Sequence, residues 1–182
     1  MDIRNLPAGY TLLGALPTLP RPGIDRLSHK SSSLKNEWLY ILRRDNYLCL
    51  LLKTPSQSFV INGAHYPTEE PGLRVRQLEF PIRALAWIIT TIEAGFWKEK
   101  SGLSELNCLQ RHASIDGEKL RITFIQNYRT DTTKGISIEN YSRKGRYLNW
   151  QEMGFSLETL LEGKLLDFWK RVIGEYERGF RF

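Results

Sequence analysis

The sequence predicts an α+β protein made of two strand-rich repeats, each ending in an amphipathic helix (ββββα twice), packed as an intramolecular pair. Strand-like alternation of apolar and polar residues occurs in two blocks, and each block is followed by apolar residues at helical spacing. The two helix entries also match, because Phe80-Pro81-Ile82 parallels Phe155-Ser156-Leu157. Four strands and one helix do not easily cover both faces of a sheet, so two units are expected to pack together. A single α+β domain with an unrelated strand order is the alternative.

Residues 1–35 are expected to form an irregular, basic arm that contains Pro and Ser. Pro17, Pro20 and Pro22 lack backbone donors, and Ser31-Ser32-Ser33 adds a polar tract. This arm is either a disordered leader or a segment that wraps a partner, and its leucines (Leu12, Leu13, Leu16 and Leu19) leave open that part of it docks onto a neighbouring surface. The remainder, residues 36–182, is predicted to be one globular domain with repeats at 36–100 and 118–178.

The first repeat begins with a predicted hairpin of residues 37–44 and 47–53. Asp45-Asn46 lies at its two-residue turn. Further strands are expected at residues 58–62 and 73–78.

A helix with a broad apolar face follows at residues 80–97. Pro81 suits its first turn, where a missing donor costs nothing. Residues 98–117 are expected to be a loop or a short helix.

The second repeat begins with a strand at residues 119–125. Residues 135–150 then predict two strands joined by a short polar connection, the second of them at 146–150. Residues 151–154 are either an edge strand or a link. Ser156 is expected to cap a helix that Gly163 weakens without breaking.

Composition is ordinary for a soluble protein, with 41% hydrophobic and 25% charged residues. The net charge of +6 and the pI near 9.4 favour an anionic partner only weakly. No apolar run is long enough to cross a membrane. The first residues lack the pattern of a secretory signal, and two cysteines make no disulfide framework. An intracellular location is therefore expected.

No catalytic, cofactor or metal motif is present. The chain has no GxxxxGK or GxGxxG loop, and its carboxylates are scattered. Cys108 and His112 stand four residues apart without a second pair of ligands, so a structural role is expected for them. We therefore expect no cofactor, no metal and no enzymatic activity, although a carboxylate cluster assembled by the fold would reopen that question.

Basic and aromatic residues concentrate between residues 121 and 150. Cations attract phosphates, and aromatic rings stack on unpaired bases, so this mixture is typical of single-stranded nucleic-acid binding. A basic hairpin whose aromatic side chains belong to the core is the alternative interpretation. The candidate binding residues are Arg121, Arg129, Arg143, Lys144, Arg146, Tyr147 and Trp150, with Arg74 and Arg76 as a similar edge in the first half.

This arrangement resembles the PUR and Whirly group of single-stranded nucleic-acid-binding proteins, whose strand-rich repeats each end in a helix and pair. The local resemblance is to the PUR strand pair, on Ile138-Glu139-Asn140 followed by Lys144-Gly145-Arg146-Tyr147-Leu148. The first half lacks a Gly-Arg-aromatic run, and Asn62-Gly63-Ala64-His65-Tyr66 is a degenerate counterpart. The resemblance implies binding of single-stranded DNA or RNA.

The predicted function is thus largely sequence-tolerant binding of single-stranded DNA or RNA by basic strand faces and aromatic stacking. The alternative is a protein-interaction or assembly module, in which exposed aromatic residues and the N-terminal arm contact a protein partner or a second copy in a homodimer.

Overall fold

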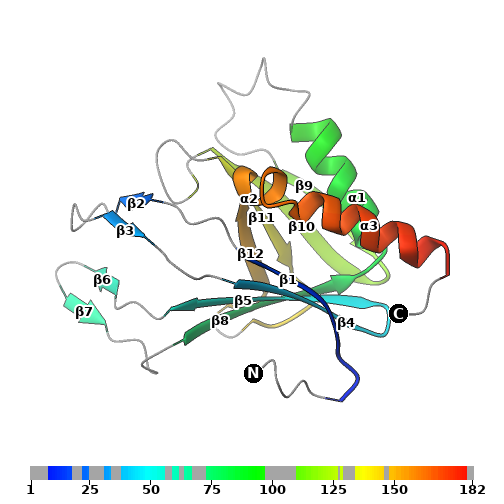
Figure 1. The fold of residues 1–182 in the computed structure, drawn as a ribbon, viewed down its shortest axis with the longest axis horizontal. Coiled ribbons are helices and arrows are strands. Elements are labelled where there is room, and N and C mark those ends of the chain that lie inside the picture. The colour runs from blue at the N-terminus through cyan, green and yellow to red at the C-terminus, as the bar shows by residue number, and fades with distance from the viewer. Residues whose placement is uncertain are drawn as a thin grey trace.

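The structure is a computed structural model that describes residues 8–17, 22–24, 31–33, 38–55, 59–61, 64–66, 73–96, 110–126, 128, 134–145 and 148–179. It contains two four-stranded antiparallel sheets with helical segments packed against them (Figure 1). The α+β class and the strand-rich character of both halves are therefore confirmed.

The first sheet has the order β1-β4-β5-β8, which is also the order of these strands along the chain. Its strands are β1 (Thr11–Pro17), β4 (Trp38–Arg44), β5 (Tyr47–Pro55) and β8 (Leu73–Pro81). Two small hairpins lie in the connections, β2 (Pro22–Ile24) with β3 (Ser31–Ser33) and β6 (Phe59–Ile61) with β7 (Ala64–Tyr66).

The hairpin predicted around Asp45-Asn46 is confirmed. Arg44 pairs with Tyr47, and Asp45 adopts a positive φ of 51°. Asp tolerates this left-handed conformation better than most residues, which is why the pair closes a two-residue turn.

Strand β1 corrects the prediction that residues 1–35 are irregular throughout. Leu13 and Leu16 pack against the core, while the strand forms the edge of the sheet. The register shifts between Leu12 and Gly14, where an added Cβ would lie 2.7 Å from Cε2 of Phe168. Pro17 ends the strand, and proline is acceptable on an edge because its missing donor breaks no ladder bond.

The second sheet has the order β12-β11-β10-β9. Its strands are β9 (Gln110–Ile115), β10 (Glu118–Ile125), β11 (Gly135–Asn140) and β12 (Gln151–Ser156). Strand β9 lies where a loop or short helix was expected. Its side chains are largely exposed, as on an edge strand, so it shows little of the apolar alternation by which strands are recognised.

The prediction of a strand at residues 146–150 is wrong for the part that the structure describes. The partner of β11 is β12, with Asn140 opposite Gln151, and Leu148 to Trp150 belong to the connection between them. The backbone N–H of Gly145 donates to the carbonyl of Leu148 at 3.1 Å. This bond uses backbone groups that a sheet ladder would need, so the described residues between the two strands, 141–145 and 148–150, belong to a connection.

The helical segments are α1 (Ala84–Thr90) with the π-helical turn η1 (Thr91–Phe96), and α2 (Leu157–Leu161) with α3 (Leu165–Glu177). Ser156 caps α2 as predicted, because its Oγ accepts from the N–H of Thr159 at 3.0 Å. The expected continuous helix is interrupted. Lys164 has a φ of 57°, and an added Cβ at Gly163 would lie 2.5 Å from the carbonyl oxygen of Thr159.

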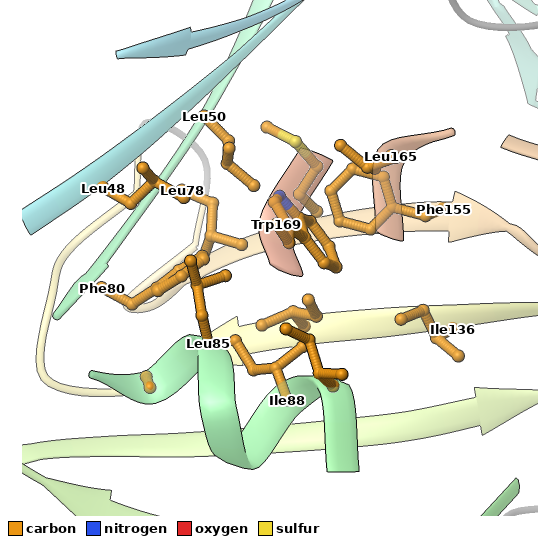
Figure 2. Close-up of a cluster of buried hydrophobic side chains, with 14 of the residues drawn as sticks. Leu48, Leu50, Leu78, Phe80, Leu85, Ile88, Ile136, Phe155, Leu165 and Trp169 are labelled. Atoms are coloured by element: carbon orange, nitrogen blue, oxygen red, sulfur yellow. The ribbon is translucent and has the colours of Figure 1, made fainter. Parts of the chain in front are cut away.

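The main core lies where the two sheets and the helices meet. Figure 2 shows Trp169 of α3 between side chains of β5, β8, β12 and α1. Its ring meets that of Phe155 edge to face, with centroids 5.6 Å apart. Strand β8 contacts β12, and α1 contacts α3, so the two halves share one core. A smaller cluster of Leu42, Cys49 and Leu51 occupies the other face of the first sheet.

Candidate nucleic-acid interface

The 141–150 connection joins β11 to β12 and carries several of the predicted binding residues. Its described residues fall into two groups. Arg143 enters the junction between the two sheets, whereas Tyr141 and Trp150 stack on each other at the end of the second sheet.

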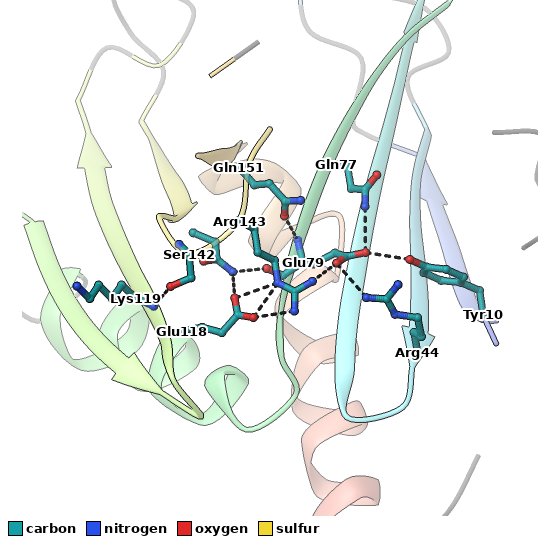
Figure 3. Close-up of polar contacts among 10 residues, drawn as sticks. Tyr10, Arg44, Gln77, Glu79, Glu118, Lys119, Ser142, Arg143 and Gln151 are labelled. Carbon is teal, nitrogen blue, oxygen red and sulfur yellow. Dashed lines mark hydrogen bonds and ion pairs between the residues drawn. The ribbon is translucent and has the colours of Figure 1, made fainter. Parts of the chain in front are cut away.

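Arg143 lies between two buried carboxylates, one from each sheet (Figure 3). Its Nε donates to the Oε1 and Oε2 of Glu118 at 2.8 and 3.0 Å, and its Nη1 donates to Oε2 of Glu79. The hydrogen bonds with Glu118 are the main cause that raises the pKa of Arg143 above its ordinary value. The guanidinium also lies 4.4 Å from the ring centroid of Tyr47. Arg143 is thus a bidentate, charge-assisted link between β10 and β8.

Glu79 is the residue on which this junction converges. Its Oε1 accepts from the hydroxyl of Tyr10 at 3.0 Å and from Nε2 of Gln77 at 2.9 Å. Nη2 of Arg44 lies 3.5 Å from its Oε2. Only 4% of Glu79 is exposed, so these partners replace the water that a carboxylate would otherwise require.

The main chain of Glu79 also bonds to the second sheet. Its N–H donates to Oε1 of Gln151 at 2.7 Å, and its carbonyl accepts from Nδ2 of Asn140 at 2.7 Å. Nδ2 of Asn140 also donates to Glu118. Side-chain amides of the second sheet thereby satisfy the backbone of β8 at the point where the two sheets meet.

Arg121 belongs to the face of the second sheet that is turned away from the core. It forms an ion pair with Glu139 of the neighbouring strand, and the hydroxyl of Tyr141 donates to the same carboxylate. The guanidinium carbon of Arg121 lies 5.0 Å from the ring centroid of Tyr141. Burial first, and then the hydrogen bond to Glu139, raises the pKa of Tyr141 to about 12.

Tyr141 and Trp150 form what we call the platform. Their ring centroids are 5.6 Å apart and the ring planes differ by 29°. Tyr141 is 39% exposed and Leu148 of the same connection is 41% exposed. Lys119 and Lys144 are exposed as well and make no ion pair within the described residues. The surface therefore combines stacked rings, an exposed aliphatic side chain and positive charge.

The structure brings some of the predicted binding residues together and separates others. Arg121 and Trp150 meet at Tyr141, whereas Arg143 enters the junction. Arg76 is exposed. It lies on the same face of β8 as the core residue Leu78, two positions before it. Arg129, Arg146 and Tyr147 lie outside the described residues, and for Arg74 only the backbone is described.

Sequence reasoning did not single out Glu79 or Glu118, and it counted Tyr141 among the aromatic residues of the basic segment without making it a candidate binding residue. The local pattern gives no signal for Glu79, because a residue between Leu78 and Phe80 on a strand lies on the opposite face, where exposure to water is expected. Its burial is a result of the packing, and a buried carboxylate requires a partner. Which cation supplies that partner depends on the packing of the two sheets, and no local pattern contains this information.

Within the described ranges, no group of three or more His, Cys, Asp or Glu side chains is arranged to hold a metal ion. No described helix is both long and apolar enough to cross a membrane.

Comparisons with known proteins give limited results. No protein-family model and no curated protein matches the chain. The solved structures that resemble it include a chain from a guide-RNA-binding protein complex bound to a guide RNA. The two chains are 13% identical with a TM-score of 0.39, over 81% of this chain and 86% of the other. A similarity of this size assigns neither a fold family nor a function.

Proposed function

We propose that the protein binds single-stranded DNA or RNA, with little sequence preference, at the platform and the cations around it. The observation that carries this proposal is the exposed ring of Tyr141 stacked on the half-buried ring of Trp150, with the guanidinium of Arg121 against the first ring. A flat, accessible ring stacks on any base, since every base has a π-face. Nearby cations then attract the phosphates that connect the bases.

The residues around the platform have different roles in this proposal. Arg121 is paired with Glu139 and holds the ring of Tyr141, so its main contribution is to orient the stack. Lys119 and Lys144 are the described cations nearby that supply charge to phosphates. Arg143 contributes through its position in the junction, because both carboxylates beside it already compensate its charge.

We also propose that the two halves are repeats of a PUR- or Whirly-like unit, and that the protein acts by binding and not by catalysis. What supports the repeat is the parallel element order, since each half supplies one antiparallel sheet of four strands in chain order, followed by helical segments. The paired helices α1 and α3 relate the two halves further.

The test compares Tyr141→Ala with a matched control, using fluorescence anisotropy of a labelled single-stranded oligothymidine. Loss of one stacked base weakens binding by about 1–3 kcal/mol, or roughly 5- to 150-fold, with no change in salt dependence because stacking releases no counterion. Leu161→Ala removes an equally exposed apolar side chain from α2 and should leave binding unchanged. A folded Tyr141→Ala protein that binds as tightly as the unsubstituted protein would refute the proposed site.

The second candidate function is protein assembly. The observation that favours it is an exposed apolar strip at the edge of the first sheet, where Leu12 is 43% and Trp38 41% exposed. Pro17 is opposite Trp38 in the register, so the strip continues across β1 and β4. Light scattering coupled to size exclusion distinguishes the two functions. Assembly predicts an oligomer without oligonucleotide that Trp38→Ala dissociates, whereas nucleic-acid binding alone predicts a complex that forms only when oligonucleotide is added.

A further inference from the structure

Three residues that bond to Glu79 lie just before, inside and just after the 141–150 connection, the segment that carries the platform. Asn140 immediately precedes Tyr141 and donates to the carbonyl of Glu79. Arg143 lies inside the connection and pairs with the Glu79 carboxylate. Gln151 immediately follows Trp150 and accepts from the Glu79 N–H. One residue of the first sheet is thus bonded to both ends and to the middle of the connection.

From this arrangement we infer that Glu79 is a positioning residue for nucleic-acid binding, which holds the Tyr141–Trp150 platform in its binding geometry through Arg143. The inference rests on the proposed function, because it assigns a new role at the same site. It also predicts that the first sheet controls the affinity of a site on the second.

The turn at the beginning of the connection is fixed residue by residue. The N–H of Tyr141 donates to the carbonyl of Lys119 at 2.9 Å, and the N–H of Ser142 donates to Oδ1 of Asn140 at 2.9 Å. Oγ of Ser142 accepts from the N–H of Lys119, also at 2.9 Å. Arg143 follows, and its guanidinium donates from Nε to Glu118 and from Nη1 to Glu79. The side chain of Asn140 bonds both to the N–H of Ser142 and to the main chain of Glu79, so it already links the start of the turn to the first sheet. Arg143 is the point at which the carboxylate of Glu79, and not its main chain, determines where the turn lies.

The alternative is that the Arg143–Glu79 pair only joins the two sheets. The geometry separates the two roles, because the backbone of Glu79 bonds to Asn140 and Gln151 independently of its carboxylate. Glu79→Gln removes the charge that holds Arg143 and leaves these backbone bonds in place. The sheets should therefore remain joined, while the middle of the connection loses its ion pair with β8 and keeps at most a weaker hydrogen bond to a neutral amide oxygen.

The experiment measures binding of labelled single-stranded oligothymidine together with amide hydrogen exchange of the protein without oligonucleotide. We expect Glu79→Gln to weaken binding roughly five- to tenfold, within the range of coupling between linked sites, at an unchanged salt slope. Exchange at the amides of Tyr141 and Ser142 should become faster, while exchange in the core strand β10 stays as before. A purely structural role would instead accelerate exchange in β8 and β10 together.

Glu152→Gln is the matched control. Glu152 is a carboxylate of β12 whose Oε1 accepts from Oγ of Ser137 at 3.0 Å, and its charge is one of the causes that raise the pKa of Tyr141. Its substitution therefore removes a carboxylate near the platform without removing a bond between the connection and β8. This substitution should not weaken binding or accelerate exchange at Tyr141. If Glu79→Gln does not fold, Arg143→Lys tests the same link, because lysine keeps the charge but lacks the forked geometry that reaches both carboxylates.

The outcomes separate failure of the inference from failure of the proposed function. Unchanged affinity and unchanged exchange in Glu79→Gln, together with weakened binding in Tyr141→Ala, would overturn the positioning role and leave the site intact. Unchanged binding in both variants would refute the site. Faster exchange at Tyr141 in Glu79→Gln would in that case still show that Glu79 orders the connection, but would remove its role in binding.

Discussion

Arg143 and Lys144 are adjacent cations, and replacing each by Ala should give opposite phenotypes. Arg143 is 21% exposed at its side chain and pairs with two carboxylates, whereas Lys144 is exposed and has no ion-pair partner among the described residues. We expect Arg143→Ala to destabilise the fold, and Lys144→Ala to weaken nucleic-acid binding at nearly unchanged stability.

The magnitude follows from what each substitution leaves behind. Removing Arg143 leaves Glu79 and Glu118 buried with fewer partners, and breaking a buried ion pair costs about 3–5 kcal/mol. Glu79 keeps Arg44 and Tyr10, and Glu118 keeps Asn140, so the lower value of about 3 kcal/mol applies. For a chain of this length that lowers the melting temperature by about 6–12 °C. Lys144→Ala should change stability by less than about 0.5 kcal/mol and reduce the salt slope of binding by up to about one unit.

Urea unfolding followed by circular dichroism measures the first effect, and anisotropy titrations at several salt concentrations measure the second. The unfolding slope should be the same in all proteins, so that a shift in midpoint reports stability. An Arg143→Ala protein as stable as the unsubstituted one, with a reduced salt slope, would show that Arg143 contacts phosphate and that the junction contributes little.

Two further predictions concern ionisation. Burial raises the pKa of the Cys49 thiol to about 12, so iodoacetamide should label it at neutral pH only after unfolding, in a Cys108→Ser background; rapid labelling of the folded protein would contradict its buried position. The pKa of Tyr141 is raised from 10.0 to about 12, so its stabilising contribution is complete below about pH 10 and is lost as the pH rises towards 12. A tyrosinate absorbance titration should therefore lose its latest-ionising step in Tyr141→Phe, and loss of an early step would contradict the bond to Glu139.

Local patterns in the sequence were sufficient for the elements whose signals are local. The turn at Asp45-Asn46 and the cap at Ser156 each depend on residues within four positions, and both occur where they were predicted. Strands β1 and β9 were not predicted because each is an edge strand with many exposed residues. An edge strand of this kind buries few of its side chains, so its sequence shows only weak alternation of apolar and polar residues.

The 141–150 connection illustrates a different limit. Its basic and aromatic residues were interpreted as one binding hairpin, whose cations and rings would all meet the same ligand. The structure divides the described ones, because Arg143 has buried carboxylates within reach and Lys144 does not. The difference originates in Glu79, 64 positions away in the chain. A sequence pattern records that Arg143 is charged but not which charge neutralises it.

This division changes how positive charge should be counted as evidence for nucleic-acid binding. Arg121 and Arg143 are both close to acidic side chains, so the basic excess of the region overstates the charge that a phosphate would meet. The aromatic part of the argument becomes stronger, since Arg121 orients Tyr141 and Tyr141 stacks on Trp150. Binding at this site should therefore depend more on stacking, and less on salt, than the count of lysines and arginines in the segment implies.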